Sequence, residues 1–329
     1  MQLKEVGEFG LIDLIREGTI VNPENIIVGI GDDAAVYLPG HRQLGLLTTD
    51  MLVETVHFDL TKTTLWQLGY RAIAVNLSDI AAMGGNPRHA VVSIGLPRQF
   101  SVEQVVELYQ GMKEICHEFG VNIIGGDTVA SPRGMVINVA VVGEVEPVNL
   151  LRRSGAKAGD LVVVTGTLGD SACGLDLLLR PGWEEYEFAW PLVTAHLTPR
   201  PRVSIGRKLA GWGATSCDDI SDGLASEAHE LAKASQVGIR LYEERVPLSA
   251  DLLQAADLLG KAALDYALYG GEDFELVFTI PPEISAELLA AELPFTVVGE
   301  VTEPAAGVVL VGRDGQAVLL EAKGYNHFR

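Results

Sequence analysis

The sequence is short of positive charge. Its 329 residues include 24 lysines and arginines against 44 aspartates and glutamates, which gives a formal net charge of −20. A chain with this balance repels nucleic acids and anionic membrane surfaces, so we expect neither as a partner. A phosphorylated ligand would therefore need metal ions or a locally positive pocket in order to bind.

The sequence also has few cysteines and no long apolar run. Cys116, Cys173 and Cys217 are far apart and form no CxxC pair, which is typical of reduced thiols in a protein core. The apolar stretch at residues 135–142 is much shorter than the roughly 20 residues of a membrane-spanning helix. The first residues, MQLKEVGEFG, lack the basic and apolar parts of a signal peptide. These features predict a soluble protein of the cytoplasm.

The length and the hydrophobic pattern indicate two domains of mixed helix and strand. A single core rarely grows beyond about 250–300 residues. The elements do not alternate strictly, which is typical of an α/β (or α+β) layer fold. A polar, basic stretch at 150–160 predicts the linker, so the domains are expected at residues 1–149 and 150–329. The expected helices are 8–17, 63–83, 101–119, 170–179, 202–210 and 224–234, and the expected strands are 26–28, 34–38, 44–49, 89–96, 121–124, 135–145, 161–165, 274–280, 296–301 and 308–311.

The stretch IIVGIGDDAAVYLPG partly matches a dinucleotide-binding turn. Gly29, Gly31 and Ala34 fit the pattern G-x-G-x-x-A. However, Asp32 and Asp33 lie inside the turn, where they would repel a pyrophosphate. The residues after Ala34 alternate and stop at a Pro-Gly pair, which predicts a strand instead of the helix that such a turn requires. A tight bend beside two carboxylates indicates a cation site instead.

Acidic residues recur at the ends of predicted strands and the beginnings of predicted helices. Asp79 is the most informative, because it lies three residues after Asn76 on one face of an apolar helix, where charges are rarely buried unless they are paired or bind metal. A solvated turn explains one such motif but not the whole set, so we expect the acids to converge on a multi-metal phosphate site. Asp222 could equally cap the helix that begins near Gly223. The motifs are Asp32-Asp33, TTD at 48–50, NLSD at 76–79, GGD at 125–127, CDDISDG at 217–223 and GGEDFEL at 270–276.

Eight motifs occur in one order along the chain: GIGDDAA, TTDMLVETVHF, AVNLSDIAAMGG, GGDT, RRSGAKAGD, DISDG, GGEDFEL and GYNHF. This ordered set resembles the thiamine-monophosphate kinases, a family of the aminoimidazole-ribonucleotide-synthetase-like ATP-binding superfamily. The resemblance extends from Gly7 to Phe328. It implies phosphorylation of thiamine monophosphate to thiamine diphosphate by ATP with several Mg²⁺ ions. It also implies a homodimer of two-domain subunits whose N-terminal sheets pair.

The resemblance further implies roles for individual residues. Asn326 stands where the family more often has Asp, which affects the expectation for Tyr325, and Asp218 adds an acid that could be a spare ligand or have no role. The implied magnesium ligands are Asp33, Thr48, Thr49, Asp50, Asp79, Asp127, Asp219 and Asp222. The implied ATP contacts are Tyr109, Gly126, Asp127, Arg153 and Ser221, and the implied contacts to thiamine monophosphate are His57, Glu272 and Tyr325.

Simple structural explanations remain open for four of these positions. His57 lies among apolar neighbours and could be a core histidine, and Tyr109 could serve packing alone. Arg153 could be a solvated linker residue, although its basic patch is also a source of positive charge for ATP phosphates. Tyr325 could belong to a disordered tail, although an aromatic ring there would suit the thiazolium cation.

The sequence offers no evident nucleophile–base pair of Ser, His or Cys. We therefore expect direct in-line transfer without a general base or a phosphoenzyme. The alternatives are another ATP-using enzyme of the superfamily, a metal-dependent phosphohydrolase, and a non-catalytic acidic binding module. A hydrogenase-maturation enzyme would end in a reactive cysteine, whereas this chain ends NHFR, and a selenophosphate synthetase would have a cysteine well before Cys116. The EF-hand pattern is absent, which weakens the calcium-binding alternative.

Overall fold

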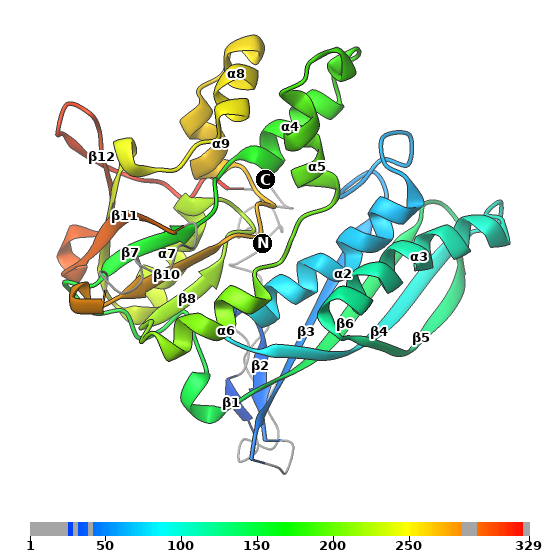
Figure 1. Cartoon of the computed structure of the whole chain (residues 1–329), viewed down its shortest axis with the longest axis horizontal. Coiled ribbons are helices and arrows are strands. Elements are labelled where there is room, and N and C mark those ends of the chain that lie inside the picture. Colours follow the sequence, from blue (N-terminus) through cyan, green and yellow to red (C-terminus); the bar gives the residue numbers. More distant parts are fainter. Residues whose placement is uncertain (1–25, 29–31, 39–41, 285–294, 325–329) are drawn as a thin grey trace, which may run out of the picture.

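The computed structural model describes residues 26–28, 32–38, 42–284 and 295–324 (Figure 1). The helix expected at 8–17 lies outside these residues. Gly29, Gly31, Tyr325 and Asn326 also lie outside them.

The first half of the chain forms a six-stranded sheet in the order β1-β2-β3-β6-β4-β5, with two long helices on one face (Figure 1). Its elements are β1 (Ile26–Val28), β2 (Ala35–Tyr37), β3 (Leu44–Val53), α2 (Leu65–Ala82), β4 (Asn86–Pro97), α3 (Val102–Phe119), β5 (Asn122–Ser131) and β6 (Val136–Val145). Strands β3 and β6 pair antiparallel along their whole length, whereas β4 and β5 are parallel because α3 connects them. The strand β2 confirms that the Asp32-Asp33 turn does not lead into a helix.

The two long helices begin and pack as their sequences indicate. Helix α3 begins with a capping box, in which Ser101 accepts from the backbone N–H of Gln104 and Gln104 accepts from that of Ser101. The helices cross closely at two glycines. A Cβ atom on Gly69 would lie 1.9 Å from the carbonyl oxygen of Leu108, and one on Gly111 would lie 1.8 Å from that of Trp66. Any larger residue at either glycine would force the helices apart.

The second half forms a seven-stranded sheet in the order β13-β12-β9-β11-β7-β10-β8, with most helices grouped at one end of it (Figure 1). Sequence periodicity did not predict α5, α8, α9, β8, β9 or β13, and α5 and α9 have no side-chain cap at their first residue. The helices are α4 (Asp170–Leu178), α5 (Ala189–Leu197), α6 (Val203–Gly211), α7 (Leu224–Ser235), α8 (Ala250–Leu259) and α9 (Ala263–Tyr269). The strands are β7 (Leu161–Thr165), β8 (Ser216–Asp219), β9 (Gly238–Tyr242), β10 (Leu276–Ile280), β11 (Phe295–Thr302), β12 (Val308–Val311) and β13 (Ala317–Leu319).

One hydrophobic core joins the two halves. It includes α2 and the inner face of the first sheet, and continues through α6 to Phe278 and Val163 of the second sheet. Helix α6 lies against the end of α2, where a Cβ atom on Gly206 would be 2.0 Å from the carbonyl oxygen of Ala81. Because this packing fixes α2 against β8, the polar ends of both elements meet.

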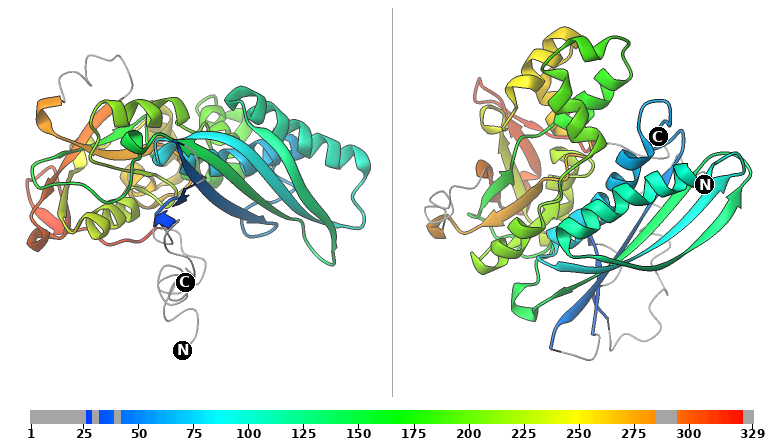
Figure 2. Two further views of the ribbon diagram at one scale, coloured as in Figure 1. Left: turned by 90° about the horizontal axis from the view of Figure 1, so that it is seen from below. Right: turned by 45° about the vertical axis from the view of Figure 1, so that its right-hand side comes forward.

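The other face of the first sheet is not covered by any described helix (Figure 2). Alternating residues of its strands are exposed there, and several are apolar. Leu47 is 44% exposed, Met51 53% and Val91 40%. A sheet face with this composition is typical of a protein–protein interface.

Among the described helices, none is both long and apolar enough to cross a membrane.

Candidate active site

Four aspartates from four separate segments meet where the two halves of the chain join. Asp33 precedes β2, Asp50 lies on β3, Asp79 on α2 and Asp219 at the end of β8. Carboxylate oxygens of Asp33, Asp218 and Asp219 lie within 4.8 Å of one another. Asp79 interacts electrostatically with Asp50, Asp219 and Asp33. We call Asp33, Asp50, Asp79, Asp218 and Asp219 the acid cluster.

Strand alternation and helix position direct these side chains inward. Thr48 and Asp50 point to the face of β3 that α2 covers, and Thr48 Oγ1 donates a hydrogen bond to the carboxylate of Asp79. On α2, Ser78 Oγ donates to Asp219 Oδ2 at 2.5 Å. The two halves are therefore connected by hydrogen bonds to the acid cluster.

Crowding keeps the acid cluster under electrostatic strain. Burial raises the pKa of Asp219 to about 8, and the charge of Asp33 adds to the effect. Burial also raises the pKa of Asp50 to about 6, and that of Asp79 well above its usual range. These three carboxylates are harder to ionise because they lose water, and Asp79 and Asp219 also face like charges.

Among the described residues, Arg153 is the cation that pairs with the acid cluster. Its Nη2 lies 2.5 Å from Asp33 Oδ1, its Nε lies 2.9 Å from Asp218 Oδ2, and its side chain is 15% exposed. The backbone N–H of Arg153 donates to both carboxylate oxygens of Asp32 at 3.3 Å. A solvated linker position for Arg153 is therefore excluded, and a single guanidinium offsets only part of the negative charge.

The acid cluster fits a divalent cation. Asp33 Oδ2 and Asp218 Oδ1 are buried and have no hydrogen-bond partner among the described residues. Hard cations such as Mg²⁺ are bound by carboxylate oxygens, and a bound cation would favour the ionised form of each acid. The residues that would hold it come from both halves of the chain.

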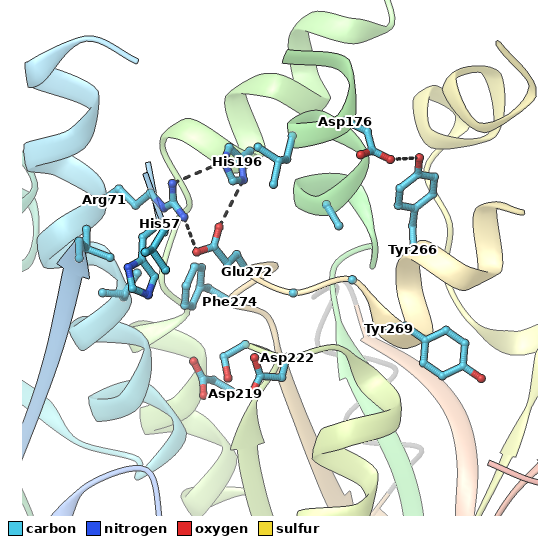
Figure 3. Close-up of a pocket in the computed structure, with 18 of the residues that line it drawn as sticks. His57, Arg71, Asp176, His196, Asp219, Asp222, Tyr266, Tyr269, Glu272 and Phe274 are labelled. Atoms are coloured by element: carbon cyan, nitrogen blue, oxygen red, sulfur yellow. Dashed lines mark hydrogen bonds and ion pairs between the residues drawn. The ribbon is translucent and has the colours of Figure 1, made fainter. Parts of the chain in front are cut away.

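A pocket of about 1300 Å³ lies beside the acid cluster (Figure 3). Asp50, Asp79 and Asp219 line one part of it, and Tyr266 and Asp176 line another. The two halves both contribute, because β3 and α2 supply one wall and α4, α9 and the segment 270–274 supply the other. The pocket therefore offers a polar, acidic end and a mixed aromatic end.

His57 lines this pocket and is not a core histidine. It follows a tight turn in which Thr55 has a φ of 71°. The backbone N–H of Val53 donates to Nδ1 of His57 at 2.9 Å. Because Nδ1 accepts, the neutral ring carries its proton on Nε2 and can donate from there.

Glu272 lies on another wall of the pocket and is held by two cationic or polar partners (Figure 3). Arg71 Nη2 forms an ion pair with its Oε1, and His196 Nδ1 lies 3.4 Å from its Oε2. Burial alone would raise the pKa of Glu272, but the charge and hydrogen bond of Arg71, together with His196 and His57, outweigh burial and lower it. Glu272 is therefore ionised at neutral pH.

The DISDG segment forms the floor near the acid cluster. Ser221 and Asp222 line the pocket, and the backbone N–H of Asp222 donates to buried Glu227 at 2.8 Å. Helix α7 has Gly223 at its N-cap and no side-chain cap. The N-cap of this helix is thus Gly223, and the capping role considered for Asp222 is not observed.

Three other expected site residues, Tyr109, Gly126 and Asp127, lie away from the pocket in this chain. Asp127 is exposed on β5, an edge strand of the first sheet. The pairing partners Asp50, Val139, Val92 and Gly126 form one row across four strands, which separates β5 from Asp50 by about 14 Å. Glycine at position 126 permits close packing of β5 on β4, since a Cβ atom added there would lie 1.9 Å from the carbonyl oxygen of Val92.

The side chains of Tyr109 and Thr49 make contacts outside the pocket. Tyr109 is half-buried on α3 and packs against the main core. Thr49 contributes to the lining of the pocket, but its side chain points to the sheet face opposite Asp50, where its Oγ1 donates to the carbonyl oxygen of Val139 at 2.9 Å and accepts from Asn138 at 2.9 Å. Their roles in binding remain predictions.

Sequence reasoning missed Arg71, Ser78 and His196. A signal for Arg71 was present, because a charged residue within an apolar helix lies eight residues, close to two turns, before Asp79. His196 gave no such signal, since α5 itself was not predicted. Ser171, His196 and Glu272 do not form a catalytic triad, because Ser171 Oγ and Glu272 both approach Nδ1 of the same ring, and Ser171 is 1% exposed.

Comparison with known proteins agrees with this architecture. Residues 31–145 match the family model "AIR synthase related protein, N-terminal domain", and residues 157–312 match the corresponding C-terminal domain. The thiamine-monophosphate kinase of Bacillus subtilis (strain 168) is 40% identical over 98% of this chain and 99% of its own length. That of Aquifex aeolicus (strain VF5) is 41% identical over 100% of both chains.

Solved structures of related proteins also match this chain over most of its length. AaThiL complexed with AMPPCP and TMP has a TM-score of 0.88 and 39% identity, and the match covers 99% of both chains. The hydrogenase maturation protein HypE in complex with ATP has a TM-score of 0.69 at 20% identity, over 97% of this chain and 91% of its own, and so shares the fold alone. The chain therefore belongs to the thiamine-monophosphate kinase family, within the AIR synthase related proteins.

Proposed function

We propose that this protein transfers the terminal phosphoryl group of ATP to thiamine monophosphate, forming ADP and thiamine diphosphate. The thiamine-monophosphate kinases of Bacillus subtilis and Aquifex aeolicus match this chain over 99–100% of their own length. The similar structure AaThiL is complexed with AMPPCP and TMP. The observation that carries the proposal is the acid cluster, which both halves of the chain build beside a pocket of about 1300 Å³. Such a site suits two phosphorylated substrates that must be brought together despite their charge.

The acid cluster would hold several Mg²⁺ ions. Asp33, Asp50, Asp79 and Asp219 are the central ligands, and Asp222 extends the set along the pocket floor. Magnesium bound there would supply charge screening for both phosphates during in-line transfer. Arg153 neutralises part of the cluster, and its contacts with Asp33 and Asp218 hold it beside the site, where ATP phosphates could reach it.

The nucleophile would be an oxygen of the substrate's own phosphate. A phosphate monoester has a second pKa of about 6, so this group is already mostly a dianion at neutral pH and needs no general base. His57 would orient it by donating from Nε2, because Nδ1 is engaged with the backbone of Val53. Glu272, an acceptor, would face the thiamine part of the substrate.

The decisive experiment measures ADP formation from ATP and Mg²⁺ with and without thiamine monophosphate. The proposal requires ADP that depends on thiamine monophosphate, with an equal amount of thiamine diphosphate detected by chromatography. A phosphohydrolase would release inorganic phosphate without an acceptor, and a binding module would form no ADP. A radiolabelled phosphoprotein trapped from γ-labelled ATP without acceptor would contradict direct transfer.

We also propose that the protein acts as a homodimer. Exposed Leu47, Met51 and Val91 on the open face of the first sheet support pairing with a second copy. Residues 1–149 would then form the dimerisation and metal-binding domain, and residues 150–329 would complete the nucleotide and substrate site. A cytoplasmic location fits the use of ATP and the free cysteines.

Tyr109, Gly126 and Asp127 would act across this dimer, because they lie away from the pocket of their own chain. Mixing two inactive variants tests this arrangement. If Asp127 acts on the partner's site, mixed dimers of Asp127→Asn and Asp79→Asn contain one intact site and regain activity. If Asp127 acts within its own chain, or has no role in the site, the mixture gives no such gain over the separate variants.

A further inference from the structure

The carboxylate of Glu272 is held from both halves of the chain at once. Arg71 comes from α2 in the first half, and His196 comes from α5 in the second. Arg71 is 4% exposed and His196 5%, whereas Glu272 remains 29% exposed toward the pocket (Figure 3). The supporting groups are therefore buried, and the group they support can reach a ligand.

The hydrogen bonds of His196 are consistent with a single neutral tautomer. Arg71 Nη1 lies 3.5 Å from Nε2, and an arginine can only donate, so Nε2 must accept. The ring proton is then on Nδ1, which lies 3.4 Å from Glu272 and 3.2 Å from Ser171 Oγ. Burial and the charge of Arg71 lower the pKa of His196 to about 4, which keeps the ring neutral.

Two features around Glu272 lower the stability of the fold, so stability does not explain why they are present. Glu272 has a φ of 68°, a left-handed conformation that a residue with a side chain rarely adopts. Arg71 Nε is buried without a hydrogen-bond partner in the described part of the chain. Backbone strain and unpaired buried donors of this kind cluster at functional sites.

The neighbouring acids of the same segment already fix its position. Asp273 accepts from the backbone N–H groups of Gly169 and Ser171, and Glu275 pairs with Arg202. Neither Asp273 nor Glu275 lines the pocket, whereas Glu272 does. The partners of Glu272 are therefore not needed to anchor the segment, which points to a role in orienting its carboxylate.

We propose that Arg71 and His196 are positioning residues, which orient the Glu272 carboxylate for the thiamine part of the acceptor substrate. The inference rests on the proposed function. A carboxylate only accepts hydrogen bonds and repels phosphate, so Glu272 cannot bind the phosphate end. Because Arg71 offsets its charge, Glu272 acts mainly as a fixed acceptor for an N–H donor, such as the amino group of the aminopyrimidine ring.

The test separates the Michaelis constants of the two substrates. Arg71→Met removes a charged hydrogen bond, so we expect the KM for thiamine monophosphate to rise about 10- to 100-fold, while the KM for ATP stays within about twofold. In a Glu272→Gln background the same change should add less than about threefold, because the group being positioned is already altered. His196→Ala should raise the same KM about fivefold, and His196→Asn, which keeps a donor near Nδ1, should restore most of the loss.

Arg202→Met is the matched control, because Arg202 pairs with an acid of the same segment that does not line the pocket. It should lower the melting temperature and leave both KM values unchanged. If Arg71→Met does not fold, Arg71→Lys replaces it with the same expected selectivity, because an ammonium cannot reproduce the guanidinium's contacts with Glu272 and His196.

Two results would overturn the inference. One is an equal rise in both KM values in the Arg71 variant, and the other is full additivity with Glu272→Gln. The wild type is measured first, since a wild type without acceptor-dependent ADP formation overturns the proposed function and the inference with it. Normal wild-type activity combined with either result overturns the inference alone.

Discussion

Two acidic segments of similar composition, CDDISDG at 217–223 and GGEDFEL at 270–276, have opposite electrostatic roles. In the first, Asp218 and Asp219 lie against Asp33, and a single guanidinium, that of Arg153, reaches the group from the described residues. In the second, each acid has a partner of its own. Glu272 pairs with Arg71, Asp273 accepts from backbone N–H groups at the start of α4, and Glu275 pairs with Arg202.

The difference shows that an acidic motif does not by itself indicate a metal site. Crowded acids repel one another and destabilise the folded chain until a cation binds, whereas paired acids hold their segment in place. Substituting one acid of each kind should therefore have opposite effects on activity and stability.

Asp79→Asn should abolish most of the activity without destabilising the protein. Loss of a central acid should lower kcat on the order of 1,000-fold, as for the loss of a key electrostatic group. The melting temperature without divalent cations should stay the same or rise, because one repelling charge is removed while Thr48 keeps its acceptor. Exposed Asp257→Asn on α8 is the control. A large loss of stability in Asp79→Asn would show that this acid is paired after all.

Glu275→Gln should have the opposite effect. Removing buried Glu275 from its pair with half-buried Arg202 should lower the free energy of unfolding by about 3 kcal/mol. Because Glu275 does not line the pocket, kcat of the folded fraction should change less than about threefold. Denaturant unfolding and initial rates at low temperature measure both quantities. Unchanged stability would remove the distinction between the two segments.

Divalent cations should stabilise the wild type through the acid cluster. At a Mg²⁺ concentration 100 times the dissociation constant, the expected gain is about 2.7 kcal/mol. Asp219→Asn should reduce this gain, whereas Glu275→Gln should leave it intact, although that variant starts from a lower stability. Thermal unfolding in chelator and in Mg²⁺ measures the shift. An equal gain in both variants would place the cation elsewhere.

His196 should make the paired region sensitive to acid. Burial lowers the pKa of His196 to about 4 in the folded chain, against about 6.5 when it is free, so the unfolded chain binds the proton first as the pH falls. The stability that neutral His196 contributes to the folded chain is therefore present above pH 6.5 and is lost on acidification. Between pH 6.5 and 5 the wild type should lose roughly 1.5 kcal/mol relative to His196→Asn. If the free energies of unfolding of the two proteins changed with pH in parallel, a neutral, buried His196 would be contradicted.

Much of the site was predictable because its residue types are costly to bury. Asp79 in an apolar helix and the acids at strand ends indicated a shared cation site, and Asp33, Asp50, Asp79 and Asp219 do converge. The sequence could not separate Asp219 from Asp273, because their different partners come from the turn before β2, from α2 and from the start of α4, all far away along the chain. Asp127 was grouped with the others by its motif alone, and the sheet order places it about 14 Å away in the same chain.

The sequence by itself determined the long helices, the central strands and the surplus of acids, because these depend on local spacing and composition. Only the tertiary structure decided which acids are crowded and which are paired, since that depends on which distant segments the core brings together. The packing of α6 and β8 against α2 places Ser78 beside Asp219, and the fold brings Arg71 to Glu272. These long-range contacts leave no local periodicity in the sequence from which they could be inferred.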